Sequence, residues 1–220
     1  VKNHRYCEMF YSIDRLGEVV HMELSDKEDI WNNITSKNRN VIRKAIKNGV
    51  KIYNGRYPEI YEKFRIIYNE TMDKDNAEDY YYFGEEFYHS ILEDLSQNAQ
   101  VFYAEKDGEV ISAAIILTAN GYMNYHLSGS KREYSSLAPT NLLLYKAALW
   151  GSTNRCRTFY LGGGVGSGED SLFKFKRAFY KGNLNHFYIG KKIFDQDTYD
   201  ELLSIRDKNV RTSFFPLYRA

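Results

Sequence analysis

Cysteine is scarce in this chain of 220 residues, and its scarcity excludes two kinds of protein. Only Cys7 and Cys156 occur, far apart and without the spacing of a zinc-ligand cluster. Two distant cysteines provide neither a disulfide framework nor a metal site. We therefore expect a reduced, cytoplasmic protein that binds no metal.

Long apolar runs and a dominant charge sign are also missing. No stretch approaches the roughly 20 apolar residues that a membrane span needs, and the first residues do not have the layout of a signal peptide. Acidic and basic residues nearly cancel, which gives a formal net charge of +1. We expect a soluble protein without a membrane span. The bulk charge does not indicate a nucleic-acid binder, although it does not exclude local basic patches.

Aromatic residues, in contrast, are abundant. The chain has 20 tyrosines and 13 phenylalanines. Tyrosines line clefts for sugars in some proteins, and in most they fill core edges and amphipathic surface. Their number leaves both interpretations open.

Hydrophobic periodicity predicts a mixed α+β chain. Alternating residues from about 100 to 130, interrupted by Asp107-Gly108 and Asn120-Gly121, predict a three-stranded antiparallel meander. Ser25 and Ser36 are placed to cap helices. Further helices are expected over 36–49, 58–72 and 84–97, from Pro139 onward, after the glycine run and over 197–207.

The segment 161–179, "LGGGVGSGEDSLFKFKRAF", has the outline of a phosphate loop because glycines lead from a strand into a helix. It lacks the lysine-serine ending of a Walker loop and the glycine spacing of a dinucleotide fingerprint. Gly162, Gly163 and Gly164 permit positive φ and a close approach of ligand to backbone. The glycines by themselves identify no chemistry.

Lys176 has an unusual place in the helix that follows. At about 100° per residue, Leu172, Phe175 and Phe179 form one apolar stripe, and Lys176 lies at its edge, about 40° from Leu172. One interpretation is that its stem covers the core edge while the ammonium reaches water. The other is a cation at the rim of a cleft, directed at developing negative charge.

Other candidates have equally ordinary alternatives. Arg39 and Arg43 are four residues apart and so share one helix face. This face is either a ridge that binds phosphate or an ordinary solvated surface. His126 is a candidate general base or a half-buried strand histidine. Glu169 is a candidate catalytic carboxylate, or it serves the N-terminus of the last motif helix.

The segments "KNRNVIRKAIKNGVKI", "YHLSGS", "FYLGGG" and "FKFKRAF" occur in an order that resembles the second domain of FemABX-like transferases, members of the GNAT acyltransferase superfamily. The resemblance covers about 24–190. Its most specific element is Phe-Lys-x-x-Phe, matched by Phe175, Lys176 and Phe179, although Tyr180 follows where the family often has glycine. It implies a GNAT-like α+β fold with a mixed, mostly antiparallel central sheet flanked by helices.

The resemblance also implies a domain organisation. Residues 1–24 are similar to the tail of a preceding GNAT-like domain that is mostly missing, and 25–190 to the transferase domain. Residues 191–220 form a C-terminal strand and helix extension, which we expect to pack on the missing domain.

The implied activity is acyl or aminoacyl transfer to an amine by direct attack, without a covalent enzyme intermediate. No cofactor is permanently bound. The donor is an acyl-CoA, favoured by the near-neutral charge, or an aminoacyl-tRNA. The acceptor is a small molecule or cell-wall precursor, an amino sugar or peptide amine used in cell-wall or surface-polysaccharide synthesis.

In the family pattern Lys176 stabilises the reacting centre, and Phe175 and Phe179 fix its helix. The glycines at 162–164 supply close-approach backbone. Arg39 and Arg43 are candidates for binding an anionic donor. The alternative is a non-catalytic GNAT-like module that binds a glycan or peptide through tyrosines. An enzyme should have an open cleft beside the glycine strand with the Lys176 ammonium facing it.

Overall fold

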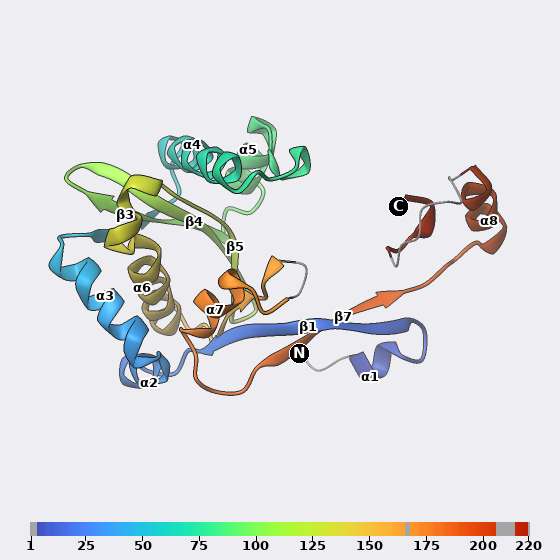
Figure 1. The fold of residues 1–220 in the computed structure, drawn as a ribbon, viewed down its shortest axis with the longest axis horizontal. Coiled ribbons are helices and arrows are strands. Elements are labelled where there is room, and N and C mark those ends of the chain that lie inside the picture. The colour runs from blue at the N-terminus through green and yellow to red at the C-terminus, as the bar shows by residue number, and fades with distance from the viewer. Residues whose placement is uncertain (1–3, 166–167, 206–213, 220) are drawn as a thin grey trace. The chain divides into compact units, whose positions relative to one another are not determined.

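The computed structural model describes residues 4–165, 168–205 and 214–219 (Figure 1). The chain divides into two compact units: Val19–Asn185, and Val1–Glu18 together with His186–Ala220. The first of these holds most of the fold.

A seven-stranded sheet is the centre of the architecture, with the order β2-β3-β4-β5-β6-β1-β7. Neighbours pair antiparallel in β1–β6, β2–β3, β3–β4 and β4–β5, whereas β5 and β6 run parallel. The predicted mixed, mostly antiparallel sheet is confirmed. The strands are β1 (Ser12–Glu23), β2 (Lys51–Gly55), β3 (Ala99–Lys106), β4 (Glu109–Ala119), β5 (Tyr122–Ser130), β6 (Thr158–Gly162) and β7 (Asn185–Lys191).

The predicted meander is β3, β4 and β5. Asp107 and Gly108 join the first two strands with φ of 53° and 86°, and Asn120 and Gly121 join the next two with 52° and 80°. Two-residue hairpin loops of type I′ need positive φ at both positions, which aspartate, asparagine and glycine adopt most readily. Local chain chemistry therefore determines where these strands turn.

Helices cover both faces of the sheet in the larger unit (Figure 1). On one face lie α2 (Lys27–Asn33), α3 (Ser36–Lys47), α6 (Pro139–Thr153) and α7 (Ser171–Arg177). On the other lie α4 (Pro58–Asp75) and α5 (Glu85–Glu93). Two short 3-10 helices are η1 (Asp79–Tyr81) and η2 (Arg132–Leu137).

Each face has its own hydrophobic cluster because successive strand residues point to opposite sides. On β4, Ile116 belongs to the cluster under α3 and α6, and Ile115 belongs to the cluster under α4 and α5. Gly129 of β5 lets α4 approach closely, since a Cβ there would lie 2.6 Å from the carbonyl oxygen of Ile67. The end of β5 is thereby held against α4.

The smaller unit contains α1 (His4–Cys7), the first part of β1, most of β7, α8 (Gln196–Ile205) and the 3-10 helix η4 (Leu217–Arg219). Lys191 pairs with Asp14. Tyr199 of α8 stacks on Phe215 with ring centroids 6.3 Å apart. Within the described ranges, no helix has both the length and the apolar character needed to cross a bilayer.

Candidate functional site

The sheet opens between β5 and β6. Only three residue pairs join the two strands, and the last is Asn124 with Tyr160. β5 continues to Ser130, while β6 ends at Gly162 and passes into the glycine run. Beyond Asn124, the backbone N–H and C=O groups of β5 that face β6 have no partner in β6. They are available to another hydrogen-bonding group.

A β-bulge marks the same point on β5. Ile115 of β4 pairs with Leu127, and its neighbour Ile116 pairs with Tyr125, so His126 is the extra residue. His126 is exposed by surface area, but neighbouring atoms still withdraw water from its ring and lower its pKa below the usual 6.5. Its imidazole is therefore neutral at pH 7. Within the described residues, no hydrogen bond joins it to Lys176.

Lys176 lies at the glycine end of β6. Its Nζ donates a hydrogen bond of 2.7 Å to the carbonyl oxygen of Gly163. The side chain is half-buried, and this desolvation lowers the pKa of the ammonium, an effect that the nearby Asp170 carboxylate opposes. The lysine bends back to the strand end rather than extending fully into water.

The glycines are needed for this arrangement. Gly162 has a φ of +83°, and a Cβ there would lie 3.4 Å from the Lys176 Nζ. A Cβ on Gly164 would collide with the carbonyl of Gly168 and the carboxylate of Asp170. Gly162 has the positive φ that the sequence allowed for, and the atoms that approach these glycines closely belong to the protein itself. The predicted approach of a ligand to this backbone stays a prediction.

Asp170 ties the glycine loop to α7. One carboxylate oxygen accepts from the backbone N–H of Val165 at 3.0 Å, and the other accepts from that of Phe173 at 2.8 Å. These bonds lower the pKa of Asp170. Asp170 is the N-cap of α7, whereas Glu169 is exposed and makes no described bond to Lys176. The sequence suggested Glu169 as a catalytic carboxylate or as a residue that serves the N-terminus of this helix; the capping role belongs to its neighbour Asp170, and the catalytic role of Glu169 stays a prediction.

The phenylalanines of the motif pack as a pair. Phe175 and Phe179 meet edge to face with centroids 5.4 Å apart, and Phe179 is fully buried. The predicted stripe is wrong at one position, because Leu172 is exposed and Phe173 is buried. α7 ends at Arg177, so Phe179 lies outside the helix and a wheel drawn through it assigns the wrong inner face.

Arg39 and Arg43 lie on α3 and both contact Trp31 of α2. The Nη1 of Arg39 is 3.5 Å from the Trp31 carbonyl oxygen, and the Arg43 guanidinium lies over the indole, 5.1 Å from its centroid. Neither arginine makes a described contact with Lys176. They belong to a second group of side chains around α2, α3 and α6.

The N-terminus of α6 belongs to that group, and sequence reasoning missed it. Its N-cap, Ala138, has no side chain that could bond the free N–H groups of the first turn. Asn141 donates at 2.8 Å to the Oδ1 of Asn38, a residue only 3 % exposed. The Nδ2 of Asn38 has no partner. An uncapped helix N-terminus attracts anions.

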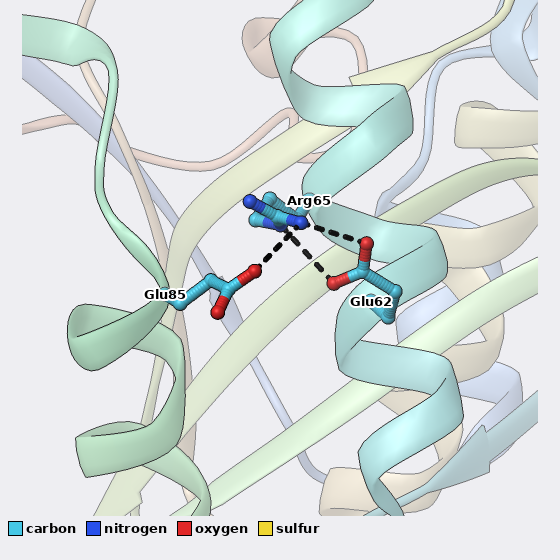
Figure 2. A network of polar contacts seen from close by, with 3 residues as sticks. All are labelled: Glu62, Arg65 and Glu85. Carbon is cyan, nitrogen blue, oxygen red and sulfur yellow. Dashed lines mark hydrogen bonds and ion pairs between the residues drawn. The ribbon is translucent and has the colours of Figure 1, made fainter.

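A cavity of about 550 Å³ lies elsewhere, between α4 and α5. Arg65 at its rim bonds Glu62 on its own helix and Glu85 on α5, at 2.8 and 3.2 Å (Figure 2). This network ties the two helices together. This cavity is not lined by residues of the β5–β6 opening. The predicted cleft beside Lys176 therefore stays a prediction. The described residues contain no cluster of three or more metal-ligating side chains.

Residues 36–177 match the family model of the acetyltransferase (GNAT) domain. No curated protein matches the chain. Among solved structures the fold is similar to FemX, with a TM-score of 0.67 at 13% identity over 86% of this chain and 68% of FemX. L-PGS from Bacillus licheniformis gives 0.61 at 14% identity, over 93% of this chain and 69% of that one. The C-terminal domain of a protein assigned as a lysylphosphatidylglycerol synthetase from Agrobacterium fabrum gives a TM-score of 0.62 at 15% identity, over 86% of this chain and 63% of that one. The predicted GNAT-like fold is confirmed.

Proposed function

The chain belongs to the GNAT acetyltransferase-domain family, and from this premise we propose that it transfers an acyl or aminoacyl group to an amine. The acceptor in this proposal is an amino sugar or a peptide amine of a cell-wall or surface-polysaccharide precursor. The observation that carries the proposal is the Lys176 ammonium, held at the end of β6 where β5 and β6 part.

The donor carbonyl would lie in the β5–β6 opening. Backbone N–H groups of β5 beyond Asn124 and the remaining N–H groups of Lys176 supply donors for the oxygen that gains negative charge. Because one Lys176 N–H is already bonded to Gly163, the ammonium is oriented before the donor arrives. Preorganised donors stabilise a tetrahedral intermediate better than mobile ones do.

The reaction needs no covalent enzyme intermediate. A C–N bond forms while the C–S bond of a thioester or the C–O bond of an ester breaks, and the leaving sulfur or oxygen takes up a proton. The attacking nitrogen loses a proton. His126 is neutral at pH 7, since desolvation lowers its pKa, and it lies at the bulge beside the opening. We assign it the role of proton acceptor.

The anionic part of the donor has a matching place. The first-turn N–H groups of α6, next to Asn141 and Asn38, suit the pyrophosphate of acyl-CoA or a phosphate of tRNA. A lysylphosphatidylglycerol synthetase among the structural neighbours supports the aminoacyl option, and the family model supports the acyl-CoA option.

Product analysis tests the proposal. The protein would be incubated with acetyl-CoA or with mixed aminoacyl-tRNA, together with amino sugars and peptidoglycan precursors, and the mixtures examined by mass spectrometry. A product heavier by one acyl or aminoacyl group supports transfer and identifies the donor. If no donor gives a product while glycans or peptides bind, the chain is a non-catalytic module.

A further inference from the structure

A second cavity lies on the helical face that carries α6. It has a volume of about 290 Å³ and is lined by Lys27, Glu28 and Trp31 of α2 and Tyr145 of α6. A nucleobase is a flat aromatic of a size that such a space accepts. Trp31 and Tyr145 are the two rings available to contact it.

The two rings are fixed by their neighbours. Their centroids are 5.0 Å apart with the planes at 54°, and Tyr145 is 6 % exposed. Arg43, outside the cavity lining, lies over the indole at 5.1 Å, and Arg39 bonds the Trp31 carbonyl oxygen. Two arginines that are not part of the cavity lining thus hold Trp31 in place. Rigid aromatic walls are the usual platform for stacking a base.

The polar residues at the mouth favour adenine. Glu28 is exposed, and its carboxylate only accepts hydrogen bonds, so it suits the exocyclic amino group of adenine. Guanine presents an oxygen at the same position, which a carboxylate repels. Lys27, also exposed, supplies a cation for a phosphate on the ribose.

The cavity is also correctly placed for a phosphate-bearing ligand. Tyr145 follows Asn141 by four residues, so both lie on one face of α6, about 6 Å apart along its axis. Asn141 contacts Asn38, whose buried Nδ2 is unpartnered. A nucleotide with its base beside Tyr145 would therefore carry phosphate toward the uncapped end of α6.

We infer that this cavity binds the adenine of the donor nucleotide, an inference that rests on the proposed function. Coenzyme A contains this chemistry, because its phosphorylated adenosine is joined to the thioester by a long pantetheine arm, which lets the base lie beside Tyr145 while the acyl group lies at the β5–β6 opening. In aminoacyl-tRNA the terminal adenosine carries the ester itself, so its base stays at the reacting centre and outside this cavity. Trp31 and Tyr145 contact the base, Glu28 accepts from its amino group, and Lys27 pairs with phosphate.

Binding without turnover tests the inference. Titration calorimetry of the full chain with 3′,5′-ADP, 5′-AMP and 5′-GMP should show both adenine nucleotides binding at least about tenfold more tightly than GMP. E28Q should reduce this preference about tenfold, because the charged acceptor is lost. E59Q, an exposed glutamate on α4 at the other face of the sheet, is the matched control and should change nothing.

Two further arms distinguish the sources of adenine. Desulfo-CoA should compete with 3′,5′-ADP, which supports the site, whereas a short RNA that ends in CCA should not. Competition by the RNA without competition by desulfo-CoA would contradict the inference. W31F keeps an aromatic platform and should retain binding, whereas W31A should lose it with an unchanged circular dichroism spectrum.

The outcomes separate this inference from the proposed function. If no adenine nucleotide binds at millimolar concentration while acyl transfer proceeds, the cavity has another role and the inference fails alone. Nucleotide binding that E28Q and W31A weaken, without transfer to any acceptor, keeps the site and removes the enzymatic proposal. Equal affinity for GMP and AMP would contradict the assignment of Glu28.

Discussion

The ammonium of Lys176 and the carbonyl of Gly163, 13 residues apart in the chain, meet at 2.7 Å. The bond crosses from α7 to the end of β6 and so closes the glycine loop on itself. It explains why glycine and lysine occur in one motif: the lysine needs a strand end without side chains in its way.

We expect K176M to lower the rate of acyl transfer by about 10²- to 10³-fold, since it removes a positioned donor from the reacting centre. K174M is the matched control, because Lys174 is exposed on the same helix. Single-turnover measurements with either donor would compare the two, with circular dichroism to verify folding. Equal rates for K176M and the wild type would refute the assigned role.

Gly162 and Gly108 allow backbone strain to be separated from the effect on the lysine. Both have positive φ, +83° and +86°, so alanine should cost about 1–2 kcal/mol of unfolding free energy at each. Only G162A places a methyl group 3.4 Å from the Lys176 Nζ, whereas G108A meets nothing within 4 Å. G162A should therefore lose transfer activity as well, while G108A keeps it. Urea unfolding and a rate assay on both variants check this, and an equal loss of activity in the two would contradict it.

Asp170 should stabilise the protein in a pH-dependent way. Its pKa is lower in the folded state than the usual 3.8, so its contribution is present above 3.8 and is lost as the pH falls through the folded value. D170N keeps a cap but not the charge. Its melting temperature should lie below that of the wild type at pH 6, and the difference should close toward pH 2. D197N, an exposed acidic residue in the first turn of α8, is the control.

The rate of transfer should fall on the acid side with an apparent pKa below 6.5, since His126 has a lowered pKa and loses its role as acceptor when protonated. H126Q should lower the rate and abolish this acid limb. H89Q is the control, because His89 is exposed on α5 and pairs with Glu93. An acid limb that persists unchanged in H126Q would exclude the histidine as the base.

The same shift in the pKa of His126 has a consequence for stability. The unfolded chain binds the proton more readily than the folded one, so unfolding free energy rises with pH from the folded pKa up to about 6.5 and is then level. H126Q should reduce this slope, which urea unfolding at several pH values measures.

Features set by neighbouring residues were predictable from the sequence. The Asp107-Gly108 and Asn120-Gly121 turns depend only on local φ preferences, and both were predicted. Helix caps were less secure: the cap of α3 is Thr35 rather than Ser36, and that of α2 is Asp26 rather than Ser25, because adjacent short polar side chains are equally suited to the role.

Features that join distant residues could not be predicted in this way. Asn38 and Asn141 are 103 residues apart, and neither lies in a recognisable motif, yet together they support the free end of α6. The stripe on α7 failed for a different reason, since the helix ends before Phe179 and its periodicity ends with it. Lys176 became a candidate through its place at the edge of the stripe and through its motif, whereas its partner, the Gly163 carbonyl, needed the three-dimensional structure.

The extra residue at position 126 keeps β5 and β6 apart through the backbone, independently of the side chains along the gap. An extra residue shifts the alternation of β5 by one, so the backbone beyond it is out of phase with the pattern that joins the strand to β6 before it. This mismatch disfavours further hydrogen bonding between β5 and β6 beyond Asn124. Deleting one residue of β5 at the bulge is therefore the change expected to extend its pairing with β6. Substitutions along the gap leave the mismatch in place.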